Sequence, residues 1–511
     1  MGFHLLPQGT GSEEKAKSRS HLRWAALFLG ELRDGSPTMI NMQSAYLIVS
    51  QGYSEKQAGI LFFVFGMSQF IFQTPAGYLY DSTERKVLWL SIAATVSMCL
   101  TLATAFFAQP MGANLTFMML VKFGQGAATS FIPPGLNSIT QGIVGSAGMT
   151  TQVSVNEMMN HTGTAIVVLT ASLIGVLMYP SLKLLFVVSP IACIGVVYFL
   201  SRIRPEDIDH EAARGLDQKV KIPTDGIYRP PSTTTPTDAG DAPFGKAAVD
   251  DQPSFTLNSD WQSIAASAFS SGSNLKADSP LRVLRDPILL TFILVCFLFH
   301  TSNGTVLPLV MQTLALGSGR AGILMSGSCI IVAQLFMVIS AKVCGEYSGK
   351  YGRKTLFLVG LFIVPIRCLI LGVLLEFRGA GDASRLMEVA ILSTQILDGI
   401  GAGVFGTMYI LVTSDISGGT GRFSMTLGLT TAAMSIGGTV SGYLGESLAQ
   451  DLGYKQAFFI LMFMSLVPAV LYLVFMPETL AILAKSSSDP RGIASIKEGE
   501  QEKVGNYKEL V

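Results

Sequence analysis

Charge is scarce in this 511-residue sequence. Only 14% of the residues are charged, and the 35 basic residues balance the 35 acidic ones, so the formal net charge is zero. A neutral chain has no global field that would favour nucleic acid or an acidic partner, and we expect no nucleic-acid binding. Glycine-rich phosphate loops and metal-binding Cys/His spacings are also missing. We therefore expect no enzyme activity, no cofactor, no metal and no ATP-driven transport from this chain alone.

Cysteine is sparse as well. All six cysteines lie in or beside apolar stretches at irregular spacing. This pattern is typical of small hydrophobic side chains in helices and fits that interpretation better than metal ligands or a disulfide framework.

Apolar residues, by contrast, are abundant. They make up 49% of the chain, with a mean hydropathy of +0.48. A helix needs about 20 apolar residues to cross roughly 30 Å of hydrocarbon. Twelve runs meet this length, which predicts an all-α, multi-pass protein in the lipid bilayer: residues 22–48, 57–79, 87–108, 115–136, 150–178, 181–201, 287–312, 320–343, 355–376, 388–411, 425–447 and 456–476.

Basic residues are concentrated in segments that precede or connect these runs on one side of the membrane. Lys15, Lys17, Arg19 and Arg23 lie at the first run, which begins too late and is too long for a cleaved signal peptide. Other basic residues lie between the second and third runs and between the eighth and ninth. The positive-inside rule then predicts that both termini and the central linker are cytoplasmic, and the plasma membrane is the favoured location.

Two short segments repeat one pattern between apolar runs. GYLYDSTERK begins at Gly77 and GEYSGKYGRK begins at Gly345, and the difference between positions 345 and 77 is 268 residues. Shorter pairs, such as Met42-Gln43 with Met311-Gln312 and Pro205-Glu206 with Pro477-Glu478, recur in the same order. Their shared order predicts two pseudo-symmetric bundles of six transmembrane helices.

This duplication divides the chain into five predicted parts. A cytoplasmic tail covers residues 1–20, the first bundle 21–201, a cytoplasmic linker 202–286, the second bundle 287–477 and a cytoplasmic tail 478–511. The linker segment Pro230 to Gly240 has few large apolar residues, so we expect the linker to be mostly disordered. Apolar residues around Trp261 have helical spacing, which fits either a short membrane-surface helix or a transient one.

The repeated segments resemble the pattern G-x-L-a-D-x-x-G-R-K of the major facilitator superfamily of secondary transporters. The first copy matches at Gly77, Asp81, Arg85 and Lys86 but has Glu84 in place of glycine. The second copy keeps a different part of the pattern and has Gly349 where the acid belongs; its matching residues are Gly345, Gly352, Arg353 and Lys354.

The resemblance implies a gating role for Asp81. In the family this acid pairs with basic groups and with a helix N-terminus of the other half in one conformation, and is released in the other. The alternative is that Arg85 and Lys86 serve only as topology signals. Because Gly349 has no charge, the first half is expected to supply the electrostatic latch.

Ionisable side chains inside apolar runs indicate the transport pathway, because each must face a cavity, a partner or water. Glu31, Arg33 and Asp34 lie together in the first run. Glu31 and Asp34 share a helix face and could hold a proton between them; the alternative is a salt-bridge cluster that only joins helices. Lys122 belongs to KFGQG, which is similar to the family's R-x-x-Q-G pattern with lysine in place of arginine.

Further candidates lie in other runs. His300 occupies the position that corresponds to Glu31, and Asn303 the position that corresponds to Asp34. His300 and His161 could titrate near neutral pH or could be packing residues. Arg367 and Asp398 are predicted partners of each other or of the substrate.

Together these patterns predict a monomeric secondary active transporter that moves a small organic solute by alternating access and is coupled to protons. One alternative is uncoupled facilitated diffusion. Another is a transporter-like receptor or scaffold that binds cytoplasmic partners through the linker and tail. No local pattern names the substrate or the direction of transport.

Overall fold

The computed structural model describes residues 10–32, 43, 46–178, 181–217, 277–315, 320–378 and 385–480. Every regular element in these ranges is a helix. The described residues all belong to one compact unit, Met1–Lys221 with Ala277–Val511. Arg33, Asp34 and the predicted helix around Trp261 lie outside the described residues.

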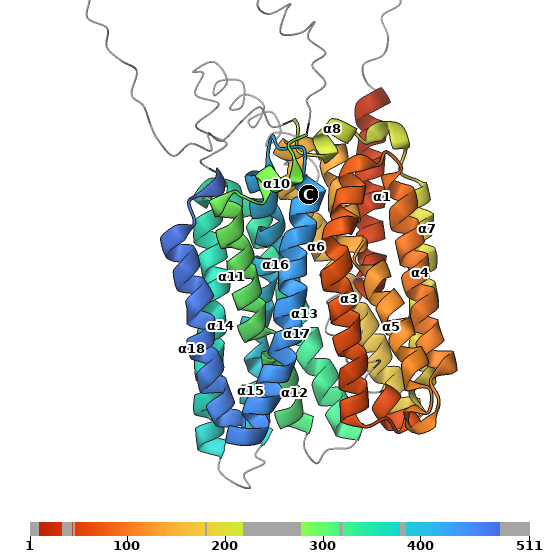
Figure 1. The fold of residues 1–511 in the computed structure, drawn as a ribbon. Coiled ribbons are helices and arrows are strands. Elements are labelled where there is room, and N and C mark those ends of the chain that lie inside the picture. The colour runs from red at the N-terminus through yellow and green to blue at the C-terminus, as the bar shows by residue number, and fades with distance from the viewer. Residues whose placement is uncertain are drawn as a thin grey trace, which may run out of the picture. The chain divides into compact units, whose positions relative to one another are not determined.

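The described residues of the first half form eleven helical elements (Figure 1). In chain order they are α1 (Thr10–Leu32), η1 (Tyr46–Ser50), α3 (Glu55–Ser82), α4 (Lys86–Phe107), η2 (Pro110–Gly112), α5 (Leu115–Thr129), α6 (Ile132–Met178), η3 (Leu182–Val187), α7 (Val188–Ser201), η4 (Pro205–Asp207) and α8 (His210–Ala213).

The second half follows after the linker and is drawn in green to blue in Figure 1. Its helices are α10 (Pro280–Val283), α11 (Pro287–Asn303), α12 (Val306–Ala315), α13 (Arg320–Tyr351), α14 (Arg353–Arg378), α15 (Arg385–Ser393), α16 (Gln395–Ser417), α17 (Phe423–Leu452) and α18 (Tyr454–Phe475).

Nine helical segments of the described chain are long and apolar enough to cross a membrane. One of them, Leu115–Met178, covers two of the predicted runs, because α5 ends at Thr129 and α6 begins at Ile132. Within α6, the chain bends at Gly145, whose φ is +66°. Two predicted runs are not among the nine. Part of the run 22–48 lies outside the described residues, and the run 425–447 falls in α17, which is rich in glycine, serine and threonine.

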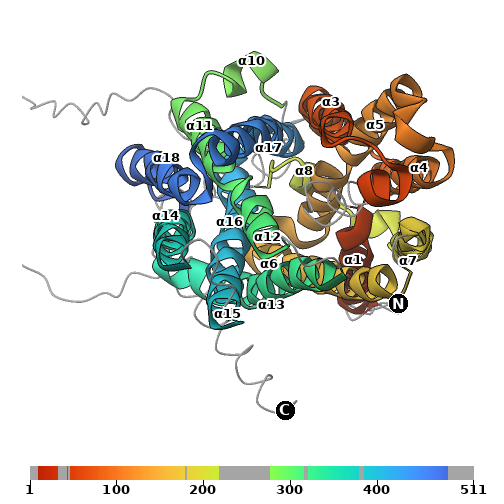
Figure 2. The same ribbon diagram turned by 90° about the horizontal axis from the view of Figure 1, so that it is seen from below.

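The two halves meet along two helix pairs. α3 packs against α17, and α6 packs against α13, as Figure 2 shows from one end of the helices. A Cβ atom on Gly77 would lie 2.1 Å from the Ser424 backbone oxygen, and one on Gly345 would lie 2.7 Å from the Ser154 Cβ. The first glycine of each repeated segment therefore permits the close approach of a helix from the other half.

The segments that adjoin the linker also pack onto the helices. Asp209 N donates to Gly142 O at 2.9 Å, and Gly419 N donates to Gly215 O at 2.8 Å. On the returning side, Asp278 N donates to Thr420 O at 2.8 Å. Both segments thus contact the loop between α16 and α17. From their polar composition alone, the sequence predicted these segments only as parts of a linker.

Candidate functional site

The first repeated loop reaches across to the second half through Asp81. Its carboxylate, at the end of α3, accepts hydrogen bonds from Ser424 N at 2.9 Å and Met425 N at 2.8 Å. These amides belong to the first turn of α17, where backbone N–H groups have no partner within the helix. The side chain is 2% exposed, so its negative charge is offset by the amides and by the positive end of the α17 dipole.

The two basic residues of this loop have different surroundings. Lys86 is fully buried and donates to the Tyr80 backbone oxygen, whereas Arg85 is exposed at the start of α4. Across the contact, the Arg422 guanidinium lies 5.0 Å from the centre of the Tyr78 ring. An arginine of the second half therefore adds a cation–π contact beside Asp81.

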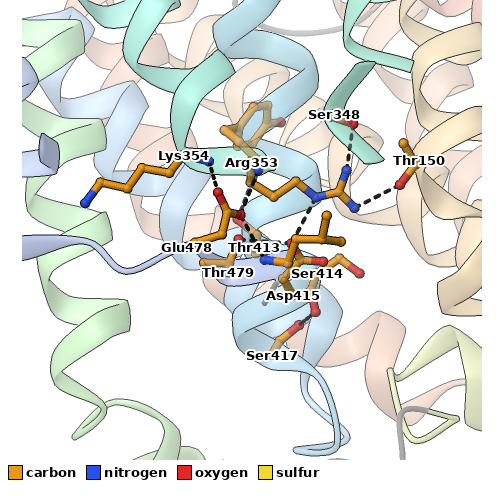
Figure 3. Close-up of polar contacts among 12 residues, drawn as sticks. Thr150, Ser348, Arg353, Lys354, Thr413, Ser414, Asp415, Ser417, Glu478 and Thr479 are labelled. Atoms are coloured by element: carbon orange, nitrogen blue, oxygen red, sulfur yellow. Dashed lines mark hydrogen bonds and ion pairs between the residues drawn. The ribbon is translucent and has the colours of Figure 1, made fainter. Parts of the chain in front are cut away.

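The second repeated loop uses its arginine to reach the first half (Figure 3). Arg353 is 4% exposed, and its Nη2 donates to Thr150 Oγ1 of α6 at 2.8 Å. Its Nη1 donates to Ser348 Oγ at 2.7 Å, and its Nε donates to Asp415 Oδ2 at 3.1 Å. One guanidinium thus joins α6, α13 and α16 at the same end of the helices as Asp81, which we call the basic end.

Glu478 completes this cluster from beyond α18. Its carboxylate accepts from Arg353 N at 2.7 Å and Lys354 N at 2.9 Å, which caps the start of α14 (Figure 3). Gly352, with φ of +86°, makes room for it, since an added Cβ would lie 2.3 Å from a Glu478 oxygen. Gly349, in contrast, has open space around it, with no atom within 4 Å of an added Cβ. The second half therefore places its acids at Asp415 and Glu478.

Glu31 lies inside the first half. Its Oε1 accepts from Ser189 Oγ of α7 at 2.7 Å, and the side chain is 4% exposed. The neighbouring Gly30 faces α6, because an added Cβ would lie 2.6 Å from the Asn160 backbone oxygen. The shared proton site with Asp34 stays a prediction, because Asp34 lies outside the described residues.

Lys122 is fully buried in α5. Its ammonium donates to Gln43 Oε1 and, at 2.9 Å, to Gln125 Oε1, and it lies 5.7 Å from the centre of the Phe62 ring. Gln125 in turn donates to Thr101 Oγ1 at 2.8 Å. The amide oxygens and the ring therefore solvate this cation within the first half.

The candidates of the second half lie in two places. Arg367 on α14 donates from Nη1 to Asp398 of α16 and, at 3.0 Å, from Nη2 to Gln395 Oε1, and it is 1% exposed. His300 Nδ1 lies 3.0 Å from the Cys296 backbone oxygen on its own helix, and Asn303 ends the same helix. The predicted pairing of Arg367 with Asp398 is thus present in the structure.

His161 lies at the contact between the halves. Its Nδ1 is 2.8 Å from Gln334 Oε1 of α13, and its Nε2 is 3.8 Å from Glu157 Oε2, one helical turn earlier on α6. Glu157 is 2% exposed. Among the described intramembrane candidates, His161 thus contacts the other half through Gln334.

Sequence reasoning missed several members of these clusters. Asp415 is a charged residue just beyond the predicted run 388–411, and Glu478 belongs to the repeated Pro-Glu pair. The sequence therefore contained a pattern that could have identified both. Thr150 and Gln334 are neutral polar residues without one. Within the described residues, no group of three or more His, Cys, Asp or Glu side chains is arranged to hold a metal ion.

Comparisons of the sequence identify the family. The profile of the Major Facilitator Superfamily matches residues 34–380. The chain belongs to the Major Facilitator Superfamily. It is also 30% identical, over 454 residues, to uncharacterized MFS-type transporters of two Mycobacterium tuberculosis strains, CDC 1551 / Oshkosh and ATCC 25618 / H37Rv; the match covers 88% of this chain and 91% of each relative.

Solved structures agree on the fold. The proton:xylose symporter XylE bound to 6-bromo-6-deoxy-D-glucose is similar with a TM-score of 0.60 and 15% identity, covering 93% of this chain and 99% of that one. XylE from E. coli in a partially occluded inward open conformation gives a TM-score of 0.60 at 13% identity, covering 91% of this chain and 99% of that one. These similarities confirm the predicted all-helical, polytopic membrane fold.

The family also answers the coarser functional questions. The chain is an integral, multi-pass membrane transporter of this superfamily and not an enzyme, and its partners are a transported solute and the membrane. The apolar runs had predicted the multi-pass membrane protein, and the repeated loops had predicted the transporter family. Membership of the family does not by itself specify the solute or the mode of coupling, which are the subject of the proposal below.

Proposed function

We propose that this chain is a secondary active transporter that moves a small organic solute by alternating access, driven by a proton gradient. It works as a monomer in which the two halves open in turn on either side of the membrane. The basic end, with both termini, faces the cytoplasm, and the plasma membrane is the proposed location. XylE is itself a proton:xylose symporter, so this fold is compatible with proton coupling.

The observation that carries this proposal is the carboxylate of Asp81 on the first turn of α17. It joins the halves through two amide hydrogen bonds of 2.9 and 2.8 Å, not through a large apolar core. Hydrogen bonds to a charged group contribute about 1.5–3 kcal/mol each. Reversing a two-state equilibrium from 1:99 to 99:1 takes about 5.5 kcal/mol. A contact of this size stabilises one state without making it permanent.

Arg353 supports the same reading from the other half. Its bond to Thr150 crosses between halves, whereas its bonds to Ser348 and Asp415 stay within the second half. Opening the basic end would therefore break one hydrogen bond of the guanidinium and leave its charge paired. An arrangement of this kind lets the halves separate without leaving a buried charge alone.

The remaining sequence candidates have proposed roles at the pathway. Glu31 and Asp34 are candidates for proton coupling, and Lys122, His161, His300, Asn303, Arg367 and Asp398 line or brace the cavity. Glu31, Lys122, His300, Arg367 and Asp398 have contacts within their own half, whereas His161 contacts Gln334 of the second half.

Uptake into proteoliposomes tests the proposal. The purified chain would be assayed with a panel of organic anions, sugars, amines and drugs, with and without an imposed pH gradient. We expect accumulation of at least one class that depends on the gradient. Uptake that equilibrates and ignores the gradient would indicate a uniporter, and absence of flux for every class would favour a receptor or scaffold; either result contradicts the proposal.

A further inference from the structure

Gln73 is a polar side chain buried in α3, one of the helices that join the two halves. It is 0% exposed. In the part of the chain that the structure describes, neither its amide oxygen nor its amide nitrogen has a hydrogen-bond partner. Buried polar side chains in proteins nearly always have at least one partner. An amide with none therefore requires a physical explanation.

Gln73 shares one face of α3 with two glycines that touch α17. Gly66 lies seven residues before it and Gly77 four residues after it, and these spacings place the three on the same side of a helix. A Cβ atom on Gly66 would lie 2.4 Å from Thr439 Oγ1 of α17. From the other side, a Cβ atom on Gly428 of α17 would lie 2.4 Å from the Gln73 backbone oxygen. The two helices therefore touch before, at and after Gln73.

The preceding glutamine of α3 has a different environment. Gln69 is 4% exposed, and its Nε2 donates to Thr129 Oγ1 of α5 at 3.1 Å. Both residues of this bond belong to the first half, so separation of the halves leaves it intact. The same separation removes α17 from the face of α3 that carries Gln73. Gln73 therefore changes its surroundings when the halves move apart, whereas Gln69 keeps its partner.

Burial of the Gln73 amide opposes closure of this contact. An amide that leaves water for a packed interior without a new partner loses its hydrogen bonds to water and gains none in return. When the basic end opens, this face of α3 borders the aqueous cavity, and water can bond to both amide atoms. Asp81, eight residues later on the same helix, acts in the opposite sense, because its carboxylate gains two amide donors from α17 on closure.

We propose that Gln73 destabilises the closed basic end and so keeps the closed and open states of the transporter close in free energy. The hydrogen bonds of Asp81 stabilise the closed state, and the unpartnered amide of Gln73 offsets part of that stabilisation. One helix, α3, thereby contributes both to closing and to reopening the basic end. This inference rests on the proposed function, because it requires the halves to separate at this end.

Spin labels at the basic end test this without knowledge of the solute. Ser82→Cys and Lys350→Cys place labels on exposed positions of the two halves, in a Cys99→Ser background that removes the exposed native cysteine. Distances would be measured by pulsed electron resonance on the full chain in nanodiscs. Gln73→Met replaces the amide with an apolar side chain of similar length. We expect the ratio of the short-distance to the long-distance population to rise about tenfold, because closure no longer buries an unpartnered amide.

Two further variants separate this effect from a general change in packing. Gln69→Met is the matched control, because it removes a bond within the first half, and it should leave the ratio unchanged. Asp81→Asn should favour the open state, and addition of Gln73→Met should restore the closed population. An unchanged ratio in Gln73→Met, or an equal shift in Gln69→Met, would overturn this inference and leave alternating access intact. A single distance population in both the unsubstituted chain and Asp81→Asn would contradict the alternating access on which the inference rests.

Discussion

At the scale of single residues, buried charges fall into two groups that the sequence cannot distinguish. Arg367 is paired within the second half, with Asp398 and Gln395, whereas Arg353 extends its contacts to Thr150 of the first half. Both arginines are 4% exposed or less. The first arrangement favours a stability role, and the second favours a role in joining the halves.

Loss of the Arg367 charge is expected to destabilise the protein strongly. Arg367→Gln leaves Asp398 buried without its cation, and breaking one member of a buried pair typically costs about 3–5 kcal/mol. Lys342→Gln is the matched control, because its partner Glu346 is 3.9 Å away and both side chains are mostly exposed. Thermal unfolding in detergent should show a large decrease in Tm for the first variant and little change for the second; equal shifts would contradict this assignment.

Residue-level prediction relied on charged side chains, which are rare within and between the apolar runs of a membrane protein. The Asp81 and Arg353 positions were named because charges between apolar runs are conspicuous, and the structure places both at contacts between the halves. Thr150 and Gln334 were missed because hydroxyl and amide side chains are common in helices and have no periodic signal. The sequence also predicted that the first half would supply the latch; in the structure, Arg353 of the second half makes a further contact between the halves.

At the scale of elements, two helix pairs join the halves, and glycine sets how closely they pack. Gly77 touches the first turn of α17, and Gly428 of α17 faces α3, with an added Cβ 2.4 Å from the Gln73 backbone oxygen. The apolar runs predicted these helices well. The bend of α6 at Gly145 and the packed segments beside the linker were not predicted, because they depend on tertiary contacts made by polar residues.

A methyl group on Gly77 should loosen the α3–α17 contact. In Gly77→Ala, the added carbon would lie 2.1 Å from the Ser424 oxygen, so the helices must move apart. We expect faster hydrogen exchange at the amides of Ser424 and Met425, which donate to Asp81. Gly442→Ala on α17 is the control, since no atom lies within 4 Å of its added Cβ; unchanged exchange in Gly77→Ala would refute the close contact.

Acid is expected to weaken the short helix α8. Burial, together with the nearby Lys86 ammonium, lowers the pKa of His210 below its ordinary value of 6.5. The unfolded segment therefore binds a proton more readily, so the stability of this segment is full above about pH 6.5 and decreases as pH falls through that value. The protection factors of amides 210–215, which are corrected for the intrinsic pH dependence of exchange, should fall on acidification in the unsubstituted chain and lose that dependence in His210→Gln. The same fall in His210→Gln would assign it to another group.

At the scale of the whole molecule, a duplicated chain has an unequal pair of contacts at one end. The first repeat contributes a carboxylate to the α17 N-terminus, and the second contributes a guanidinium to α6, with Asp415 and Glu478 as its local acids. Duplication and family could be predicted from sequence because repeated patterns survive divergence. The different contacts of the two repeated segments could not be predicted, because the acids that pair with Arg353 and cap α14 lie far from the repeated loops along the chain.

The central claim, that the halves separate at the basic end and that Asp81 restrains them, is tested most directly by thiol accessibility at Ser424. Ser424 is fully buried against Asp81 and bonds to it through its backbone amide, so Ser424→Cys in the Cys99→Ser background keeps that bond. A water-soluble maleimide should label this cysteine slowly, and about tenfold faster after Asp81→Asn, which corresponds to about 1.4 kcal/mol. Equal labelling rates with and without Asp81→Asn would contradict the account.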